Sequence, residues 1–248
     1  MKNKDYWRNR IIKEFDDIYQ SNTNDILDKV SKVYLKSQRE ILKELTALQA
    51  YNRSHNVTAL SKEIMLEETL SNENKNIVLL ANNMNDLLTK NLCNSYIQTY
   101  ETVNDNLKKL GFKPKDILPA NIEDIIKQPW SGVSFSDRIW HNRDVLVYNA
   151  KDTISKGLIR GESYHTMATE LSKKMNSSYS NSRRLIETEI SASQNKANID
   201  NYKNNDIKKC EISTVLDNKC CMDCSDREGK VIDVEKAVIG MNVPPFHP

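Results

Sequence analysis

The sequence predicts a mainly α-helical fold with long N-terminal helices and a C-terminal helical module that ends in a small β-hairpin with a cysteine knuckle. Three observations carry this prediction. The 248 residues include only six glycines and six prolines, fewer than turn-rich sheets use. Apolar residues recur at helical spacing over most of the chain. The spacing becomes alternating only near the C-terminus, where strands are expected.

Residues 1–110 are predicted to form a region of long helices. A first short helix is expected to end at residues 22–24, where Asn, Thr and Asn offer caps. A helix of about 25 residues with one buried stripe then starts at Ile26. A further helix is expected over 60–70, followed by an Asn- and Glu-rich connection and a long helix over 77–96.

Glycine and proline mark residues 111–132 as a hinge between two halves of the chain. Residues 133–248 form the second predicted domain. Its helices are expected over 139–158, over 163–175 with Ser163 as N-cap, and over 180–202.

After the last of these helices, two short strands are predicted. Ile212, Thr214 and Leu216 point to one side of the first strand, and Val231 and Ile232 lie in the second. We expect an antiparallel pair with a cysteine-rich loop at its tip.

This loop supplies the candidate metal ligands. Cys221 and Cys224 are separated by two residues, and with His247 they fit a small metal-tied knuckle, since the turn between the thiols lets both reach one ion. Zn²⁺ is the predicted ion, and the fourth ligand is left open among Cys220, Cys210, solvent and a further cysteine. The alternative is a hairpin tip whose thiols are simply reduced. No other cofactor is expected.

The sequence predicts that the chain is not an enzyme. Glu187 and Glu189 lie two positions apart on a predicted helix and therefore on different faces, which suits acid/base catalysis poorly. The sequence contains no Gly-rich phosphate loop, and nothing supplies the third group that a Cys–His nucleophile needs.

Charge and hydropathy restrict the location. Thirty-six basic and 34 acidic side chains leave a net charge of +2, so binding of duplex DNA by bulk charge is not indicated. The first residues are charged and lack the apolar core of a secretory signal. No stretch approaches the ~20 apolar residues that span a bilayer. Five cysteines crowded mostly into one loop suit a reducing interior. We expect a soluble protein made in the cytoplasm, with no membrane partner.

Five segments of the sequence resemble, in the same order, segments of one known family. They are WSGVSFSDRIW at 130–140, GLIRGESY at 157–164, RLIETE at 184–189, the cysteine loop at 217–230 and PPFHP at 244–248. Together they resemble the phage Mu F-like minor head proteins, and the N-terminal helices resemble the Gram-positive phage and prophage members more loosely.

The chain departs from the family pattern in three places. Glu187-Thr188-Glu189 stands where many relatives have Arg-Thr-Glu, and Cys221-Met222-Asp223-Cys224 replaces the usual Cys-Pro-x-Cys. The family pattern also continues past His-Pro into an Asn-Cys-Arg-Cys run. The sequence ends before that run, so a truncated C-terminus is expected.

The resemblance implies a minor capsid, or head morphogenesis, protein of a tailed phage or prophage. Such a protein acts structurally at the portal-proximal head interior, in procapsid assembly and in DNA packaging or delivery. The implied location is the virion, with the host cytoplasm during assembly.

The implied partners are the portal, scaffold or major capsid protein, with contact to packaged DNA. The long apolar stripes suit either a closed helical bundle or a docking face for such a partner. The alternative function is a head-carried effector or toxin-delivery protein that acts on nucleic acid or nucleotide.

Overall fold

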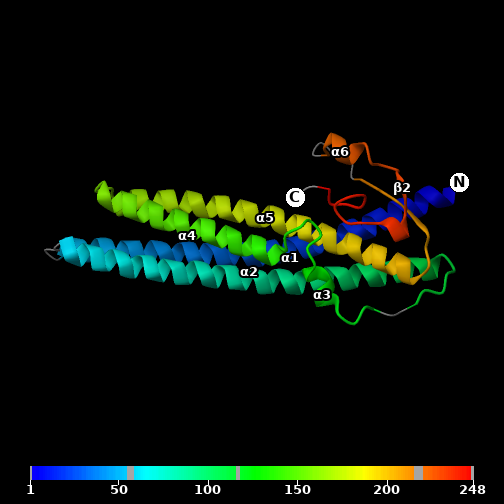
Figure 1. The fold of residues 1–248 in the computed structure, drawn as a ribbon, viewed down its shortest axis with the longest axis horizontal. Helices are drawn as coiled ribbons and strands as arrows, with labels where there is room; N and C mark the ends of the chain where they lie inside the picture. The colour runs from blue at the N-terminus through cyan, green and yellow to red at the C-terminus, as the bar shows by residue number, and fades with distance from the viewer. Residues whose placement is uncertain (1, 55–58, 116–117, 215–219, 247–248) are drawn as a thin grey trace. The chain divides into compact units, whose positions relative to one another are not determined.

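The computed structural model describes residues 2–54, 59–115, 118–214 and 220–246. It is mainly helical with one two-stranded sheet, as predicted (Figure 1). The helices are α1 (Lys2–Ser54), α2 (Ala59–Lys109), α3 (Ile122–Lys127), α4 (Phe135–Ile159), α5 (Tyr164–Asn204) and α6 (Met222–Ser225). The strands are β1 (Lys209–Glu211) and β2 (Val231–Asp233), and a 3₁₀ turn spans Val234–Lys236.

The chain groups into two compact units, and each takes segments from distant parts of the sequence. Unit 1 comprises residues 1–26, 89–134 and 185–248, and unit 2 comprises 27–88 and 135–184. The sequence predicts two domains that follow one another along the chain and are separated by a hinge. That division stays a prediction.

Two helix ends predicted in the first half are wrong. α1 continues through residues 22–24, because the polar side chains there bond within and between helices instead of capping. Asn22 donates its Nδ2 protons to the Ile18 carbonyl at 2.9 Å and to Gln98 Oε1 at 2.8 Å. α2 likewise runs without interruption through the Asn- and Glu-rich residues 71–76.

The second half has two long helices where three were predicted. α4 ends just before Gly161, as expected, where a φ of +68° favours glycine. Ser163 caps α5 as predicted, because its Oγ accepts the Thr166 N–H at 3.1 Å. The predicted break before Ser180 is wrong: this serine donates to the Asn176 carbonyl at 3.0 Å, and α5 continues to its end at Asn204.

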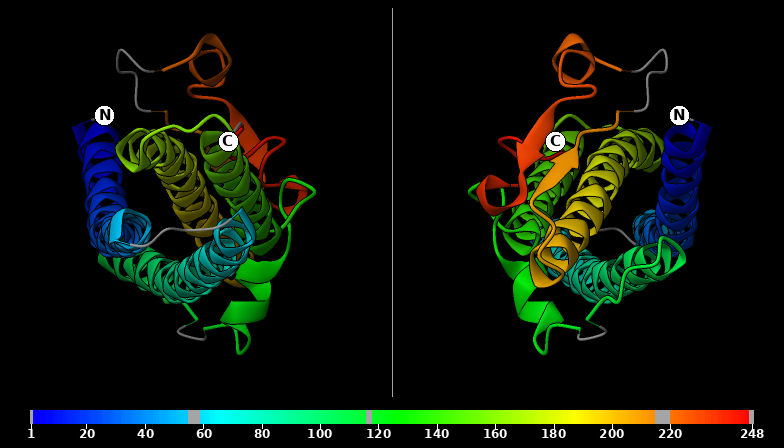
Figure 2. Two further views of the ribbon diagram at one scale, coloured as in Figure 1. Left: turned by 90° about the vertical axis from the view of Figure 1, so that its left-hand side faces the viewer. Right: turned by 90° about the vertical axis from the view of Figure 1, so that its right-hand side faces the viewer.

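The predicted antiparallel hairpin is confirmed, with its first strand earlier than expected. The register pairs Lys209 with Asp233, Cys210 with Ile232 and Glu211 with Val231. The prediction began the first strand at Ile212, but this buried residue follows β1. Its carbonyl accepts the N–H of Gly229, which turns the chain at a φ of +72°. Leu216 lies outside the described residues. Figure 2 shows the two strands side by side near the end of α5.

Unit 2 packs an almost wholly apolar helical core. Its most deeply buried apolar side chains include Val30, Ile41, Leu45, Ile77, Leu88, Ile154, Met167 and Leu171. Tyr34 makes hydrogen bonds of 2.9 Å to the hydroxyls of both Ser178 and Ser182. α4 and α5 approach closely at Gly157, where an added Cβ would overlap the Met167 side chain.

Unit 1 buries many polar side chains beside its apolar ones. The buried polar residues of this unit are Asn22, Thr23, Asn91, Ser95, Thr99, Asn104, Asn106, Thr188, Glu189, Ser193, Gln194 and Asn201. Several bond across helices: Asn201 Nδ2 donates to the Tyr100 carbonyl at 3.1 Å and to Asn104 Oδ1 at 2.7 Å. Among the described residues, no helix combines the length and apolar composition needed to cross a membrane.

Candidate functional site: the cysteine loop and the Trp130 pocket

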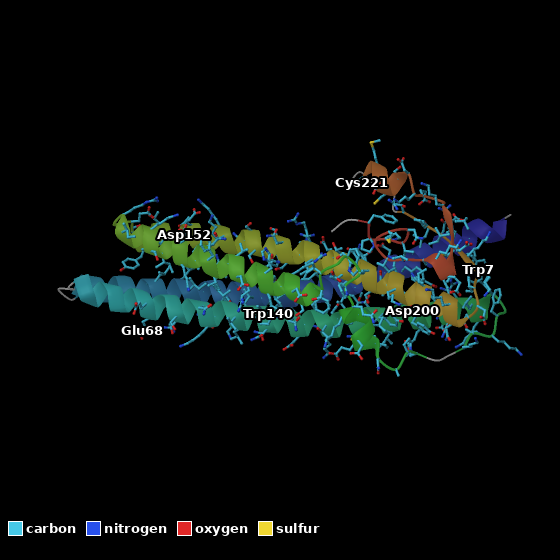
Figure 3. All side chains as sticks on the ribbon, viewed as in Figure 1. Trp7, Glu68, Trp140, Asp152, Asp200 and Cys221 are labelled. Carbon is cyan, nitrogen blue, oxygen red and sulfur yellow. The ribbon has the colours of Figure 1, made fainter. Side chains whose placement is uncertain are left out.

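The cysteine loop places two of the predicted metal ligands together. Cys221 is the N-cap residue of α6 and Cys224 lies within this short helix, so the turn brings the two thiols into hydrogen-bond contact. Both are half-buried, as is the neighbouring Cys220. Burial and the bond to Cys221 raise the pKa of the Cys224 thiol to about 11. Cys221 is labelled beside α6 in Figure 3.

The remaining predicted ligands do not complete a metal site in the part of the chain that the structure describes. His247 lies outside the described residues, and Cys210 is a strand residue in β1 whose pKa burial raises. Within the described ranges, no three His, Cys, Asp or Glu side chains are grouped so that they could hold a metal ion. The thiol pair is half of a tetrahedral donor set, so Zn²⁺ stays a prediction.

The N-terminal helix holds the base of this loop. Arg8 forms an ion pair with Glu228 and lies 3.7 Å from Glu211 on β1. Glu228 also accepts the backbone N–H of Thr214, whose hydroxyl donates to the Cys224 carbonyl at 3.2 Å. A single carboxylate therefore joins α1 to both sides of the cysteine loop.

Arg227 fastens the C-terminal segment to the same loop. Its Nη1 donates to the Met241 carbonyl at 2.8 Å, and its guanidinium carbon lies 4.1 Å from the centroid of the Phe246 ring. This is a close cation–π contact. The Phe of the Pro-Pro-Phe-His-Pro signature therefore packs on an arginine that closely follows the cysteines.

Trp130 brings together two of the signature segments, 130–140 and 184–189, and also contacts Gly240. Its indole Nε1 donates to Glu189 Oε2 at 3.0 Å, and the Glu189 side chain is almost fully buried. Gly240, with a φ of +84°, also lies close to the indole ring. A Cβ at Gly240 would stand 3.0 Å from the Trp130 ring, so glycine is required both for the backbone conformation and for the close approach.

The contact between Trp130 and Glu189 was not predicted from the sequence. In the sequence, Glu189 is notable only as a poor catalytic partner for Glu187. The spacing of residues along one helix carries no information about a contact with a loop 59 residues earlier. The available signal was that both residues belong to the family-like segments.

A pocket of about 300 Å³ opens beside Trp130 within unit 1. Its walls come from α2, from α3 and the loop after it, from α5, and from the segment 237–239. The lining residues are Leu92, Ile125, Ile126, Gln128, Pro129, Trp130, Glu189, Ala192, Ser193, Lys196, Ile199, Lys203, Ala237, Val238 and Ile239. We call this the Trp130 pocket.

Comparisons with known proteins point to one family. Residues 149–248 match the family model described as Phage Mu protein F like protein. A 120-residue alignment is 27% identical to the NAD(+)--arginine ADP-ribosyltransferase EFV of Enterococcus faecalis, and it covers 46% of this chain and 24% of that protein. The chain thus spans about a quarter of the length of this curated relative. No solved structure gives a match.

The matched residues include the cysteine loop, Glu189, Gly240 and the C-terminal signature, so most of the segments that suggested the family lie inside the match. Trp130 lies before it. Residues 149–248 of the chain are therefore similar to the Phage Mu protein F like family.

Proposed function

We propose that this protein is a structural minor component of the head of a tailed phage or prophage, acting at the portal-proximal interior in procapsid assembly and in DNA packaging or delivery. The observation that carries the proposal is the family match over residues 149–248, which suggests a phage head morphogenesis protein. The portal, scaffold and major capsid proteins are the proposed partners, with packaged DNA as a further contact.

The contacts in the matched region support a structural role. Arg8, Glu228 and Arg227 use their charges to hold the hairpin, the cysteine loop and the C-terminal segment together. The carboxylate of Glu189, which is buried, accepts a hydrogen bond from the Trp130 indole and so fixes a wall of the pocket. We therefore propose that these groups serve assembly and that the chain is not an enzyme.

Co-expression with each candidate partner tests the proposal. The protein is produced together with the portal, scaffold or major capsid protein encoded by the same phage, and the mixture is separated by size-exclusion chromatography. Co-elution with the portal oligomer is expected. A protein that elutes alone beside all three partners would contradict the proposal, and co-elution with scaffold only would move its site of action away from the portal.

The alternative function is an effector carried in the head, favoured by the partial likeness to the ADP-ribosyltransferase of Enterococcus faecalis. The named activity belongs to that protein, of which this chain covers 24%. An arginine ADP-ribosyltransferase breaks the bond between nicotinamide and ribose in NAD⁺ and joins the ribose to a guanidinium nitrogen. Incubating the purified protein with labelled NAD⁺ and agmatine tests this directly. We expect no labelled product, and its formation would establish the alternative.

We also propose that any bound metal is Zn²⁺ held by Cys221, Cys224 and His247, with Cys220, Cys210, solvent or a further cysteine as the fourth ligand. Elemental analysis of the purified protein tests this. Zinc near one equivalent is expected, with loss in the double variant Cys221→Ser/Cys224→Ser and retention in Cys93→Ser, a matched change on α2. If the wild-type protein contained no zinc, the result would favour the alternative, a hairpin tip with reduced thiols.

A further inference from the structure

The Trp130 pocket is assembled by segments that are far apart in the sequence. α2 contributes Leu92, α3 contributes Ile126, α5 contributes Ile199, and the segment 237–239 lines the pocket as well. Trp130 is fixed at this junction by its bond to Glu189 and by the close approach of Gly240. Since an indole held by these two contacts loses little further freedom when another group packs on it, the pocket is preorganised for binding.

The interior of the pocket is mainly apolar. Leu92, Ile126 and Ile199 are buried side chains of its lining, and the indole adds a flat aromatic surface. A volume of about 300 Å³ lies at the lower end of the range for ligand pockets. It suits one bulky side chain or a short piece of chain better than a large cofactor.

The charges at the pocket differ between its interior and its rim. The Glu189 carboxylate is only 3% exposed and is bonded to the indole. At the rim, Lys196 Nζ lies 2.5 Å from Asp200, which also accepts the Tyr96 hydroxyl at 2.7 Å. Lys203 is exposed and forms no ion pair with any residue that the structure describes. The accessible charge that remains for an incoming group is therefore positive.

We propose that the Trp130 pocket binds a segment of another protein that inserts one bulky apolar side chain against Trp130 and places an acidic residue at Lys203. The apolar interior supplies the anchor, since buried aromatic residues in preformed pockets dominate binding at many interfaces. The rim lysine adds selectivity for the acidic neighbour. This inference goes beyond the proposed function, because it specifies the chemistry of a partner without requiring that the partner be a head protein.

Selection from a random library of 12-residue peptides tests the inference on the full chain, followed by titration calorimetry with the synthetic winners. We expect the selected peptides to share a Leu, Ile, Phe or Trp next to Asp or Glu. Ala237→Trp fills the mouth of the pocket from a half-exposed position and should weaken binding ~10-fold or more. Val238→Trp is a second filling variant at an exposed position on the same wall, used if the first unfolds.

Charge reversal separates the rim from the interior. Lys203→Glu should weaken the binding of the acidic peptides by roughly fivefold, with a smaller effect at high salt. Lys208→Glu is the matched control, an exposed lysine outside the pocket lining, and should change little. A peptide in which Lys replaces the acidic residue should regain affinity for the Lys203→Glu variant.

Several results would overturn the inference. They are a selection that yields no binders, one that yields basic peptides, and binding that survives both filling variants. Self-association of the protein that either filling variant abolishes would assign the pocket to a second copy of this chain instead. None of these results bears on whether the protein enters phage heads, so failure here is distinguishable from failure of the proposed function.

Discussion

The two units bury their helices in different ways. Of the buried polar side chains identified among the described residues, only Ser37 and Ser182 belong to unit 2, and all the others belong to unit 1. Unit 2 is held mainly by apolar contacts, which are non-directional and tolerate many sequences. Unit 1 is held by directional hydrogen bonds as well, and these specify which partner lies opposite each helix.

This difference coincides with the position of the candidate site. The contacts of Trp130, Glu189 and Gly240, and those of the cysteine loop, all lie in unit 1. A general helical core is sufficient for unit 2, whereas unit 1 must place several loops against one another. The comparison therefore predicts that unit 2 is most sensitive to lost apolar volume and unit 1 to lost hydrogen bonds.

The largest expected effect is a cavity in unit 2. Ile154→Ala removes a fully buried side chain and should lower the free energy of unfolding by about 2–5 kcal/mol. Urea unfolding followed by circular dichroism measures it. Ile159→Ala on the same helix is the control, because that side chain is 85% exposed and its loss should cost little. Equal effects of the two changes would contradict an apolar core at Ile154.

A smaller loss is expected from the hydrogen-bond network of unit 1. Asn201→Ala removes the donor to Asn104 and to the Tyr100 carbonyl and leaves both acceptors buried, at a cost of about 1–3 kcal/mol. The same urea experiment applies, with the exposed Asn176→Ala as control. If Asn201→Ala lowered the free energy of unfolding no more than Asn176→Ala does, the contrast between the units would not hold.

Gly240→Ala tests the junction at Trp130. The substitution forces a side chain into a left-handed backbone conformation and toward the indole, and should cost about 1–2 kcal/mol. Because the indole must shift, the tryptophan emission of unit 1 should change as well, which we would record in a Trp7→Phe/Trp140→Phe background. Unchanged emission and stability would mean that Gly240 does not confine Trp130.

The smallest expected effect concerns the ion pairs. Arg8→Ala removes the pair with Glu228 that ties α1 to the cysteine loop, and should cost up to about 1 kcal/mol at low salt and less at high salt. Lys32→Ala, which breaks an exposed pair with Asp28 in unit 2, should cost less still. Thermal melts at two salt concentrations would distinguish them, and a larger loss for Lys32→Ala would reverse the expected order.

Periodicity predicted the existence of the helices better than their ends. The stripes of α1, α2 and α5 are visible in the sequence, but polar clusters such as residues 22–24 resemble caps there. Asn22 instead finds its partner, Gln98, on another helix, and such a bond depends on the packing of distant segments. α4, the cap at Ser163 and the antiparallel hairpin were predicted correctly, because glycine, N-cap and alternation signals are local.

In the candidate site, too, the sequence predicted the local feature and missed the contacts between distant segments. The spacing of Cys221 and Cys224 was sufficient to predict that their thiols meet, since one turn of chain joins them. The Trp130 pocket could not be predicted in this way, because its walls come from segments more than a hundred residues apart, such as Ile126 and Val238. Of the lining residues, only Trp130 and Glu189 belong to the segments that carried the family resemblance.

The most direct test of the central claim is quantitative mass spectrometry of phage heads purified from cells that carry the complete phage. A structural head protein should be found in the purified heads at a low and constant number of copies per portal oligomer, and deletion of its gene should reduce the yield of DNA-filled heads. Heads that lack the protein, and that assemble and fill normally after its gene is deleted, would contradict the account.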